Sequence, residues 1–223
     1  MIDKKKTDPA LGEEVHKYLV EMGVETPMDE SLDIDENSQI PTIAYYVEEI
    51  MRTLGLDLKD DSLMETPKRI AKMYVNEVFS GLDYGNFPKV TTIENRMNYS
   101  TFLLERHIAV KSNCEHHFVA FMGEAFVAYI PNEKVVGLSK INRIVEFFSR
   151  RPQVQERLTE QIFHTLCYVL GTDNVAVLIK AEHFCVKLRG VEDANAGTVT
   201  SRLGGAFYNN PALRSEFYEA IKL

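Results

Sequence analysis

The sequence predicts an α+β protein in which an antiparallel sheet follows an all-helical first half. Apolar residues recur at helical spacing through the first half, whereas the second half runs strand, strand, helix, helix, strand, strand. The 223 residues, 45% of them hydrophobic, are enough for one sizeable core with a helical extension. We expect three parts: a helix with an acidic linker over residues 1–38, a helical segment over residues 39–95 and a sheet-containing domain over residues 96–223.

Helical signals dominate the first half of the chain. Residues 26–38 hold acidic side chains and no basic one, so this stretch is expected to be a linker. The third helix is expected to have the Thr66 hydroxyl as its N-cap, Pro67 at its first position and Gly81 at its end. The expected helices cover residues 10–22, 40–54 and 66–80.

Strand-like and helical segments follow one another in the second half. Pro131 closes one strand-like run, and Gly171 stops a helix that carries one apolar stripe. The expected strands cover residues 101–112, 125–130, 174–190 and 198–203, and the expected helices cover residues 140–149, 153–170 and 209–221.

Composition narrows the range of functions. The formal net charge is −8, so a nucleic-acid partner is not expected, because phosphate backbones need a basic footprint. No apolar run reaches the roughly 20 residues of a membrane span, and no apolar stretch follows the basic N-terminus as in a secretory signal. We expect a cytoplasmic protein without a membrane partner. Three cysteines argue against a disulfide framework, and Cys167 is expected in the core because it lies in an apolar helical pattern.

A thiol and an imidazole lie three positions apart in the stretch SNCEHHF, residues 112–118. One tight turn can aim Cys114 and His117 at the same tetrahedral ion. Zinc accepts a mixture of thiolate and imidazole ligands. Alone, this pattern is a weak indication of a metal site.

A second pair, His183 and Cys185, lies in the strand expected over residues 174–190. Side chains alternate along a strand, so both are expected on one face, together with Lys187 and Arg189. Such a polar and basic face is unlike a hydrophobic core. It could line a binding site for an anionic substrate beside a metal.

Together, Cys114, His117 and Cys185 supply three ligands, and a catalytic zinc site leaves a fourth position for water. His116 and His183 then remain as proton donors or acceptors. The alternative is a pair of buried cysteines with hydrogen-bonded histidines and no metal. That alternative leaves unexplained why both cysteines lie within two residues of a histidine.

Two basic pairs are candidates for phosphate binding. Ser139 is expected to cap a helix whose free amides and dipole attract phosphate, and Lys140 and Arg143 share one side of that helix. Arg69 and Lys72 share a side of an earlier helix. For both pairs a solvated basic face is the simpler interpretation from the residues alone.

Two polar residues, Gln155 and Glu156, are expected to lie away from the apolar stripe of their helix. The Glu156 carboxylate only accepts hydrogen bonds and so could bind the N–H edge of a guanine. A surface Glu near the start of a helix needs no such role, and both interpretations stay open.

Several separated stretches, in the same order, resemble the GTP cyclohydrolase I family. The resemblance runs from about residue 40 to the C-terminus, and the first 38 residues are outside it or only loosely similar. The stretches are DSLMETPKRIAKMY (61–74), SNCEHHF (112–118), GLSKINRIV (137–145), RPQVQERLT (151–159) and HFCVKLRG (183–190).

The resemblance implies a tunnelling fold, with a four-stranded antiparallel sheet, two helices on one face and a preceding helical segment. It also implies a homo-oligomer, typically a decamer, with active sites at subunit interfaces. Zinc, one ion per subunit, would be held by Cys114, His117 and Cys185, while His116, His183 and Ser139 would be catalytic. The residues implied to bind substrate are Arg69, Lys72, Ser139, Lys140, Arg143, Gln155, Glu156 and Arg189.

The implied reaction takes GTP and water, opens the imidazole ring, releases formate and forms 7,8-dihydroneopterin triphosphate, the first step of folate biosynthesis. In it, metal-activated water attacks C8 while His183 protonates a ring nitrogen. Two alternatives remain: another pterin or deazapurine enzyme of the same fold, which would use a different ligand set, and a non-catalytic zinc-stabilised nucleotide-binding regulator. The regulator would need a fourth ligand, for which Glu115 is the nearest candidate.

Overall fold

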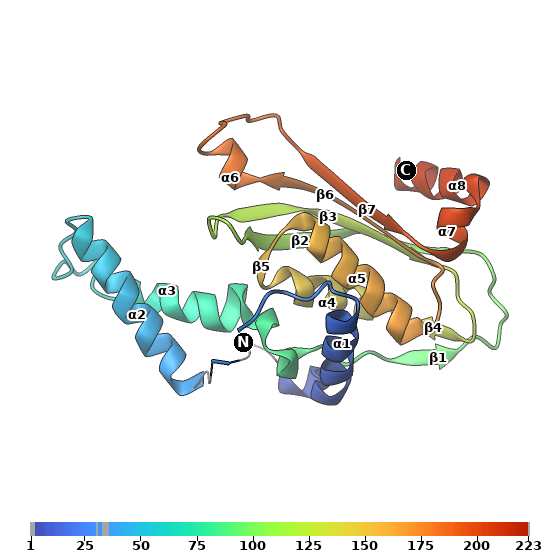
Figure 1. Ribbon diagram of the computed structural model, residues 1–223, viewed down its shortest axis with the longest axis horizontal. Coiled ribbons are helices and arrows are strands. Elements are labelled where there is room, and N and C mark those ends of the chain that lie inside the picture. The colour runs from blue at the N-terminus through green and yellow to red at the C-terminus, as the bar shows by residue number, and fades with distance from the viewer. Residues whose placement is uncertain (1–2, 30, 33–35, 223) are drawn as a thin grey trace. The chain divides into compact units, whose positions relative to one another are not determined.

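The computed structural model describes residues 3–29, 31–32 and 36–222 (Figure 1). These residues form two compact units. The helical unit comprises Pro27–Ser80, and the sheet unit comprises Asp3–Thr26 with Gly81–Leu223. The three-part division expected from the sequence stays a prediction.

Two helices and the loop between them build the helical unit. Helix α2 (Glu36–Thr53) packs against α3 (Thr66–Met73), which continues into a π-helical turn, Tyr74–Val78. Met51 and Ala71 are buried in this unit. Both helices expected here from the sequence are therefore present, although regular α-helix ends at Met73 rather than near residue 80.

Helix starts in this unit differ from the sequence-based expectation. The N-cap of α3 is Glu65, whose side chain makes no capping hydrogen bond, and Thr66 is already helical. The prediction of a Thr66 N-cap was wrong, because Pro67 is tolerated anywhere in the first turn and does not fix which residue precedes the helix. The expected acidic linker, 26–38, lies partly outside the described residues, and α2 begins at Glu36 within it.

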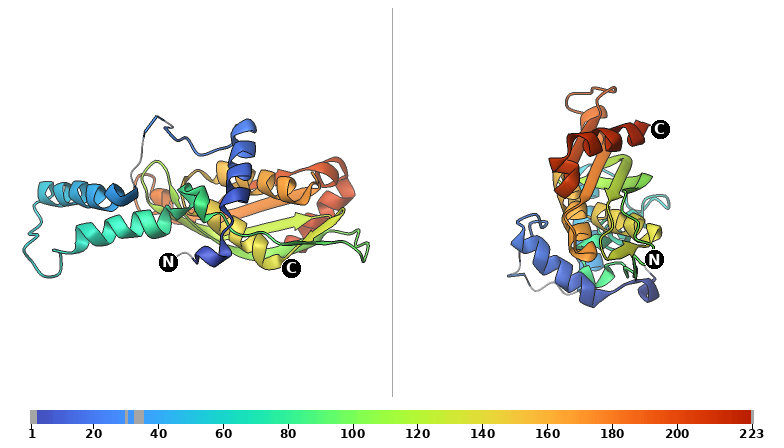
Figure 2. Two further views of the ribbon diagram at one scale, coloured as in Figure 1. Left: turned by 90° about the horizontal axis from the view of Figure 1, so that it is seen from below. Right: turned by 90° about the vertical axis from the view of Figure 1, so that its right-hand side faces the viewer.

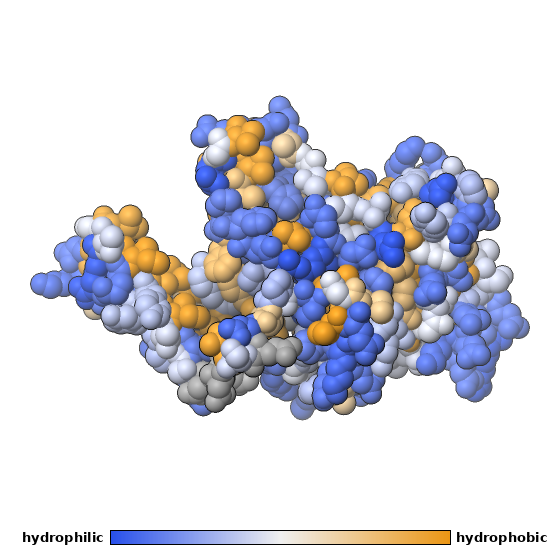
Figure 3. All heavy atoms as spheres, viewed as in Figure 1, coloured by the Kyte–Doolittle hydropathy of each residue, from blue (hydrophilic) through white to orange (hydrophobic). Residues whose placement is uncertain are grey.

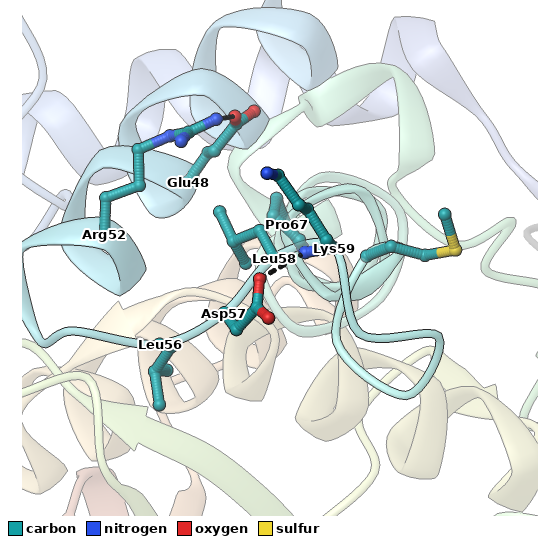
Figure 4. Close-up of a pocket in the computed structure, with 8 residues that line it drawn as sticks. Glu48, Arg52, Leu56, Asp57, Leu58, Lys59 and Pro67 are labelled. Atoms are coloured by element: carbon teal, nitrogen blue, oxygen red, sulfur yellow. Dashed lines mark hydrogen bonds and ion pairs between the residues drawn. The ribbon is translucent and has the colours of Figure 1, made fainter.

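A cavity of about 250 Å³ lies in the helical unit, beside the end of α2 and the loop that leads to α3 (Figure 4). Arg52 forms an ion pair with Glu48 there, and the Lys59 backbone N–H donates to the Asp57 carboxylate at 2.9 Å. None of the residues predicted for the site lines this cavity. The lining residues are Glu48, Arg52, Leu56, Asp57, Leu58, Lys59, Met64 and Pro67.

Hydrophobic side chains are exposed along the helical unit (Figure 3). On α2, Tyr45 and Tyr46 are exposed and Ile50 is 59% exposed, and Leu54, directly after the helix, is 71% exposed. An apolar surface of this kind is typical of an interaction face.

The sheet unit is centred on a five-stranded sheet with the strand order β5–β2–β3–β6–β7. The four strands β2, β3, β6 and β7 are antiparallel, as expected, and β5 adds a two-residue parallel strand beside β2. A separate two-stranded sheet pairs β1 with β4. The bounds are β1 Thr92–Glu94, β2 Leu103–Cys114, β3 Ala120–Tyr129, β4 Lys134–Val136, β5 Pro152–Gln153, β6 Val175–His183 and β7 Thr198–Leu203.

Helices cover both faces of this sheet (Figures 1 and 2). Along β3, Ala125, Val127 and Tyr129 belong to the larger core, which α4 and α5 cover, whereas Phe126 and Ala128 pack with the C-terminal helices α7 and α8. The period of two along the strand thus divides the core into two layers. The remaining bounds are α1 Pro9–Glu21, α4 Leu138–Ser149, α5 Gln155–Leu170, α6 Phe184–Lys187, α7 Gly205–Asn209 and α8 Pro211–Lys222. Single-turn 3-10 helices cover Lys4–Lys6, Ser80–Leu82 and Tyr84–Asn86.

The N-terminal helix is part of the sheet unit. Helix α1 packs against α5, and its Val15 and Leu19 side chains are fully buried in the larger core. Cys167 on α5 is buried in the same core, as expected, and burial raises the pKa of its thiol to about 12. Among the described residues, no helix is both long and apolar enough to cross a bilayer.

Candidate active site

A tight loop between β2 and β3 carries the first two candidate metal ligands. Strand β2 ends at Cys114, whose N–H donates to the Val119 carbonyl at 2.9 Å. The Phe118 N–H returns to the Cys114 carbonyl at 2.8 Å, and Phe118 adopts a left-handed conformation with φ of 53°. The backbone therefore reverses within four residues, which brings Cys114 and His117 to the same side of the loop.

Cys185 reaches the site on a helical turn. Strand β6 ends at His183, and Phe184–Lys187 form the short helix α6. The expectation of one long strand over residues 174–190, with alternating side chains on a common face, was wrong. The reason is the partner strand: His183 pairs with Phe121, and only one residue of β3, Ala120, lies beyond that pair.

The ligand atoms of Cys114, His117 and Cys185 all lie within 4.8 Å of one another. Burial, together with a hydrogen bond to the Cys114 thiol, raises the pKa of the Cys185 thiol. Two thiols this close repel each other when both are ionised, so they need a cation to become thiolates together. The donor set of two sulfurs and one imidazole fits zinc better than a hard cation such as magnesium.

Glu115 forms an ion pair with Arg157. Its carboxylate accepts two hydrogen bonds from the Arg157 guanidinium, at 2.6 Å from Nη1 and 3.4 Å from Nη2. Within the described part of the chain, the group that could hold a metal comprises Cys114, His117 and Cys185. Glu115 is therefore a poor fourth ligand, which weighs against a closed structural site and leaves a position for water or substrate.

The two remaining histidines have different surroundings. The side chain of His116 is 64% exposed, and its Nδ1 lies 3.5 Å from the Cys114 sulfur. His183 is half-buried and stacks on Phe121 with the ring centroids 4.5 Å apart. Burial lowers the pKa of His183, an effect that the nearby Glu156 carboxylate opposes. Both imidazoles are thus beside the candidate metal ligands in sequence, and His183 is held in place by packing.

Arg189 contacts one of the candidate metal ligands, His117. Its Nη1 is 2.9 Å from Nε2 of His117, although the side chain is otherwise exposed. A guanidinium has donors only, so His117 Nε2 is the acceptor in this contact. Of the six basic or hydroxyl residues expected to bind phosphate, Arg189 is the one that contacts a ligand residue.

Three others, Ser139, Lys140 and Arg143, lie in the first two turns of α4. The expected N-cap role of Ser139 was wrong: Gly137 is the N-cap, and Ser139 is an exposed residue inside the first turn. Gly137 gives the helix start no side-chain cap, although the Lys140 N–H already donates to the Gly137 carbonyl at 2.8 Å. Arg69 and Lys72 are exposed on α3 in the helical unit, and their role stays a prediction.

Gln155 and Glu156 begin α5 but have opposite environments. Glu156 is exposed, as expected, whereas Gln155 is only 1% exposed, so the expectation that both avoid the core was wrong for Gln155. The sequence also gave no indication of the Arg157–Glu115 pair or of the Phe121 ring under His183, because each joins residues far apart along the chain.

An α+β unit that gathers two sulfurs and an imidazole, a group that could hold a metal ion, is typical of metal-binding enzymes. The chain belongs to the GTP cyclohydrolase I family, whose model matches residues 43–222. This confirms the family that the motifs indicated.

Curated relatives match almost the whole chain. A GTP cyclohydrolase 1 of Enterobacter sp. (strain 638) is 56% identical over 218 residues, which cover 96% of this chain and 98% of that protein. One from Erwinia tasmaniensis is 56% identical over 209 residues, covering 93% and 95%, and one from Salmonella arizonae is 55% identical over 218 residues, covering 96% and 98%. The similarity therefore extends into the first 38 residues, beyond what the motifs indicated.

Proposed function

We propose that this protein is a zinc-dependent GTP cyclohydrolase I. It would hydrolyse the imidazole ring of GTP, release formate and form 7,8-dihydroneopterin triphosphate, the first step of folate biosynthesis. The observation that carries the proposal is the convergence of Cys114, His117 and Cys185 within 4.8 Å in a chain of this family. Relatives at 55–56% identity that carry the name GTP cyclohydrolase 1 support it.

Cys114, His117 and Cys185 would hold one zinc ion per subunit. Zinc supplies Lewis acidity, which makes water acidic enough to act as a nucleophile near neutral pH. The His117 side chain is exposed and Cys185 is half-buried, so the three-residue group is accessible to solvent. The Arg157–Glu115 pair supports the loop that presents Cys114 and His117, because Glu115 lies between them and is anchored to α5.

His183 would hold the proton that passes to a nitrogen of the purine five-membered ring while water adds at C8. Protonation makes C8 a better electrophile and then makes the nitrogen a better leaving group, so the C8–N bond breaks to a formamide. A second hydrolysis at the same carbon releases formate. His116 and Ser139 would assist the later proton transfers on the ribose.

The triphosphate would be anchored by basic side chains and by the open start of α4. Lys140 and Arg143 follow the uncapped helix start, and Arg189 extends toward His117. Binding energy gained at the phosphates positions the purine without weakening the reacting bonds. The full set would be Arg69, Lys72, Ser139, Lys140, Arg143 and Arg189.

Guanine would be recognised at the start of α5. The exposed Glu156 carboxylate can accept hydrogen bonds from the N–H groups of the guanine edge, which an adenine does not present in that arrangement. Gln155, expected at the same edge, is buried next to it.

The family assignment also supports a tunnelling fold, a cytoplasmic location and assembly into a homo-oligomer, typically a decamer, with active sites between subunits. The exposed side chains of Ile50 on α2 and of Leu54, directly after this helix, are consistent with burial in such an assembly.

Incubation of the purified protein with GTP and zinc tests the proposal. Formate is measured by a coupled assay and the pterin by its absorbance, with ATP as a control substrate. Stoichiometric zinc, formate and pterin from GTP alone would support it. A zinc-loaded protein that binds GTP without releasing formate would instead indicate a nucleotide-binding regulator.

A further inference from the structure

The side chain of Gln155 is enclosed by hydrogen-bonding partners at the start of α5. Its Nε2 lies 3.1 Å from the Ile179 carbonyl, 3.2 Å from the Thr198 carbonyl and 3.1 Å from the Thr200 hydroxyl. Its Oε1 lies 2.9 Å from Nε2 of His183. With 1% of its surface exposed, the amide has its polar atoms directed at protein groups of β6 and β7.

These partners decide which way the amide points. Backbone carbonyls only accept hydrogen bonds, so the amide atom that faces Ile179 and Thr198 must be the NH₂ group. The atom that faces His183 is then the carbonyl oxygen, which also only accepts. His183 must therefore carry a proton on Nε2, and its Nδ1 is the nitrogen left for a proton in transit.

A second contact fixes the plane of the same imidazole. The His183 ring stacks on Phe121 at 4.5 Å between centroids with an interplanar angle of 12°. Phe121 is fully buried, so the surface on which the ring rests is rigid. Stacking sets the ring plane, and the hydrogen bond to Gln155 sets the rotation within that plane.

We propose that Gln155 is a positioning residue for His183: its buried amide holds the imidazole as the Nε2–H tautomer, which leaves Nδ1 to exchange a proton with the substrate. This inference rests on the proposed function, because it assigns His183 the proton transfer of that reaction. It replaces direct recognition of guanine by the Gln155 side chain, whose amide has no donor to spare for a ligand while its three acceptors are in place.

Kinetics of two variants separate positioning from guanine binding. Gln155→Met keeps the size of the side chain and removes its acceptor, so kcat should fall about 10- to 100-fold, part of the contribution of a general acid or base. The KM for GTP should change less than about threefold, since no guanine contact is lost. Gln155→Glu keeps the oxygen acceptor for His183 but places its second oxygen against the Ile179 and Thr198 carbonyls, so it should recover only part of kcat. The matched control is Gln161→Met, a buried Gln two turns along the helix that bonds Gln153 instead of His183.

The tautomer is measured without any turnover. Ring ¹⁵N chemical shifts of protein labelled with [¹⁵N]histidine distinguish Nε2–H from Nδ1–H, and His183→Ala assigns the signal. The wild type and Gln161→Met should show a single Nε2–H tautomer, and Gln155→Met a mixture. Bound zinc, measured in every variant, should be unchanged, since none of the ligands is altered.

The two proposals fail in different ways. If the wild type releases no formate from GTP, the proposed function is wrong, whatever the ¹⁵N spectrum shows. If the wild type is active but Gln155→Met raises KM with kcat unchanged, or leaves the His183 tautomer as it was, the positioning role is wrong.

Discussion

A buried ion pair in the sheet unit joins Arg151 to Glu25. Arg151 is fully buried, and its Nη1 donates to the Glu25 carboxylate at 2.9 Å and to the Thr26 hydroxyl at 3.2 Å. Nη2 donates to the Gly81 carbonyl. Glu25 also accepts from the Tyr84 hydroxyl and from the Thr26 N–H. The pair thus joins the segment after α1 to the residue that precedes β5.

We expect Glu25→Ala to remove the only carboxylate that this guanidinium contacts among the described residues. Breaking a buried pair from one side costs about 3–5 kcal/mol, because the remaining charge stays buried. The ring centroids of Tyr84, Phe147 and Phe148 lie 5.2, 5.0 and 4.9 Å from the guanidinium carbon of Arg151. These cation–π contacts remain in the variant and still stabilise the buried charge in part. The expected loss is therefore near the lower limit, about 3 kcal/mol, or about 6–12 °C in Tm for a chain of this size.

Equilibrium unfolding in urea, at one protein concentration for all variants, measures this loss. Glu25→Gln keeps hydrogen-bonding atoms at this position but leaves the Arg151 charge without its counter-charge, so it should lose about 2 kcal/mol, less than Glu25→Ala. Glu21→Ala, an exposed carboxylate on α1, is the control and should change stability by less than about 0.5 kcal/mol. A loss of less than about 1 kcal/mol for Glu25→Ala would mean that Arg151 does not depend on this counter-charge.

Three further predictions concern the active site. Cys185→Ser should lose zinc and GTP turnover together, because two ligands hold the ion far more weakly than three; normal zinc content with normal formate release would exclude Cys185 as a ligand. His183→Ala should keep its zinc, measured by metal analysis, and lose formate release by at least about 100-fold, and full activity would remove its acid role. Arg189→Ala should raise the KM for GTP about 10-fold or more, as expected for one lost charge-assisted phosphate contact, and an unchanged KM would argue against that contact.

Local sequence pattern was sufficient where the structure depends on neighbouring residues. The spacing of Cys114 and His117 predicted a single turn that joins them, and the turn is closed by hydrogen bonds within five residues. Strand β7 has the predicted bounds, and α4 and α5 differ from the predicted ones by two residues at their starts. Periods of two and 3.6 residues are properties of the local backbone, so the sequence carries them directly.

Prediction failed where a distant strand decided the outcome. Residues 184–190 have an alternating pattern typical of a strand, yet β6 ends at His183, where only one residue of the partner strand β3 remains. The sequence pattern predicts that Gln155 lies on the surface at the start of a helix. It is buried instead, because one carbonyl of β6 and one of β7 accept hydrogen bonds from its side chain.

The residues alone were enough to predict the family, the order of the main elements and the three candidate metal ligands. The folded chain was needed to learn how Cys185 meets the other two ligands, that Glu115 pairs with Arg157, and which nitrogen of His183 is held by Gln155. Hydrogen bonds and ion pairs between side chains depend on distances in space. Gln155 and His183 are 28 positions apart and Glu115 and Arg157 are 42 apart, so no local sequence pattern predicts these contacts.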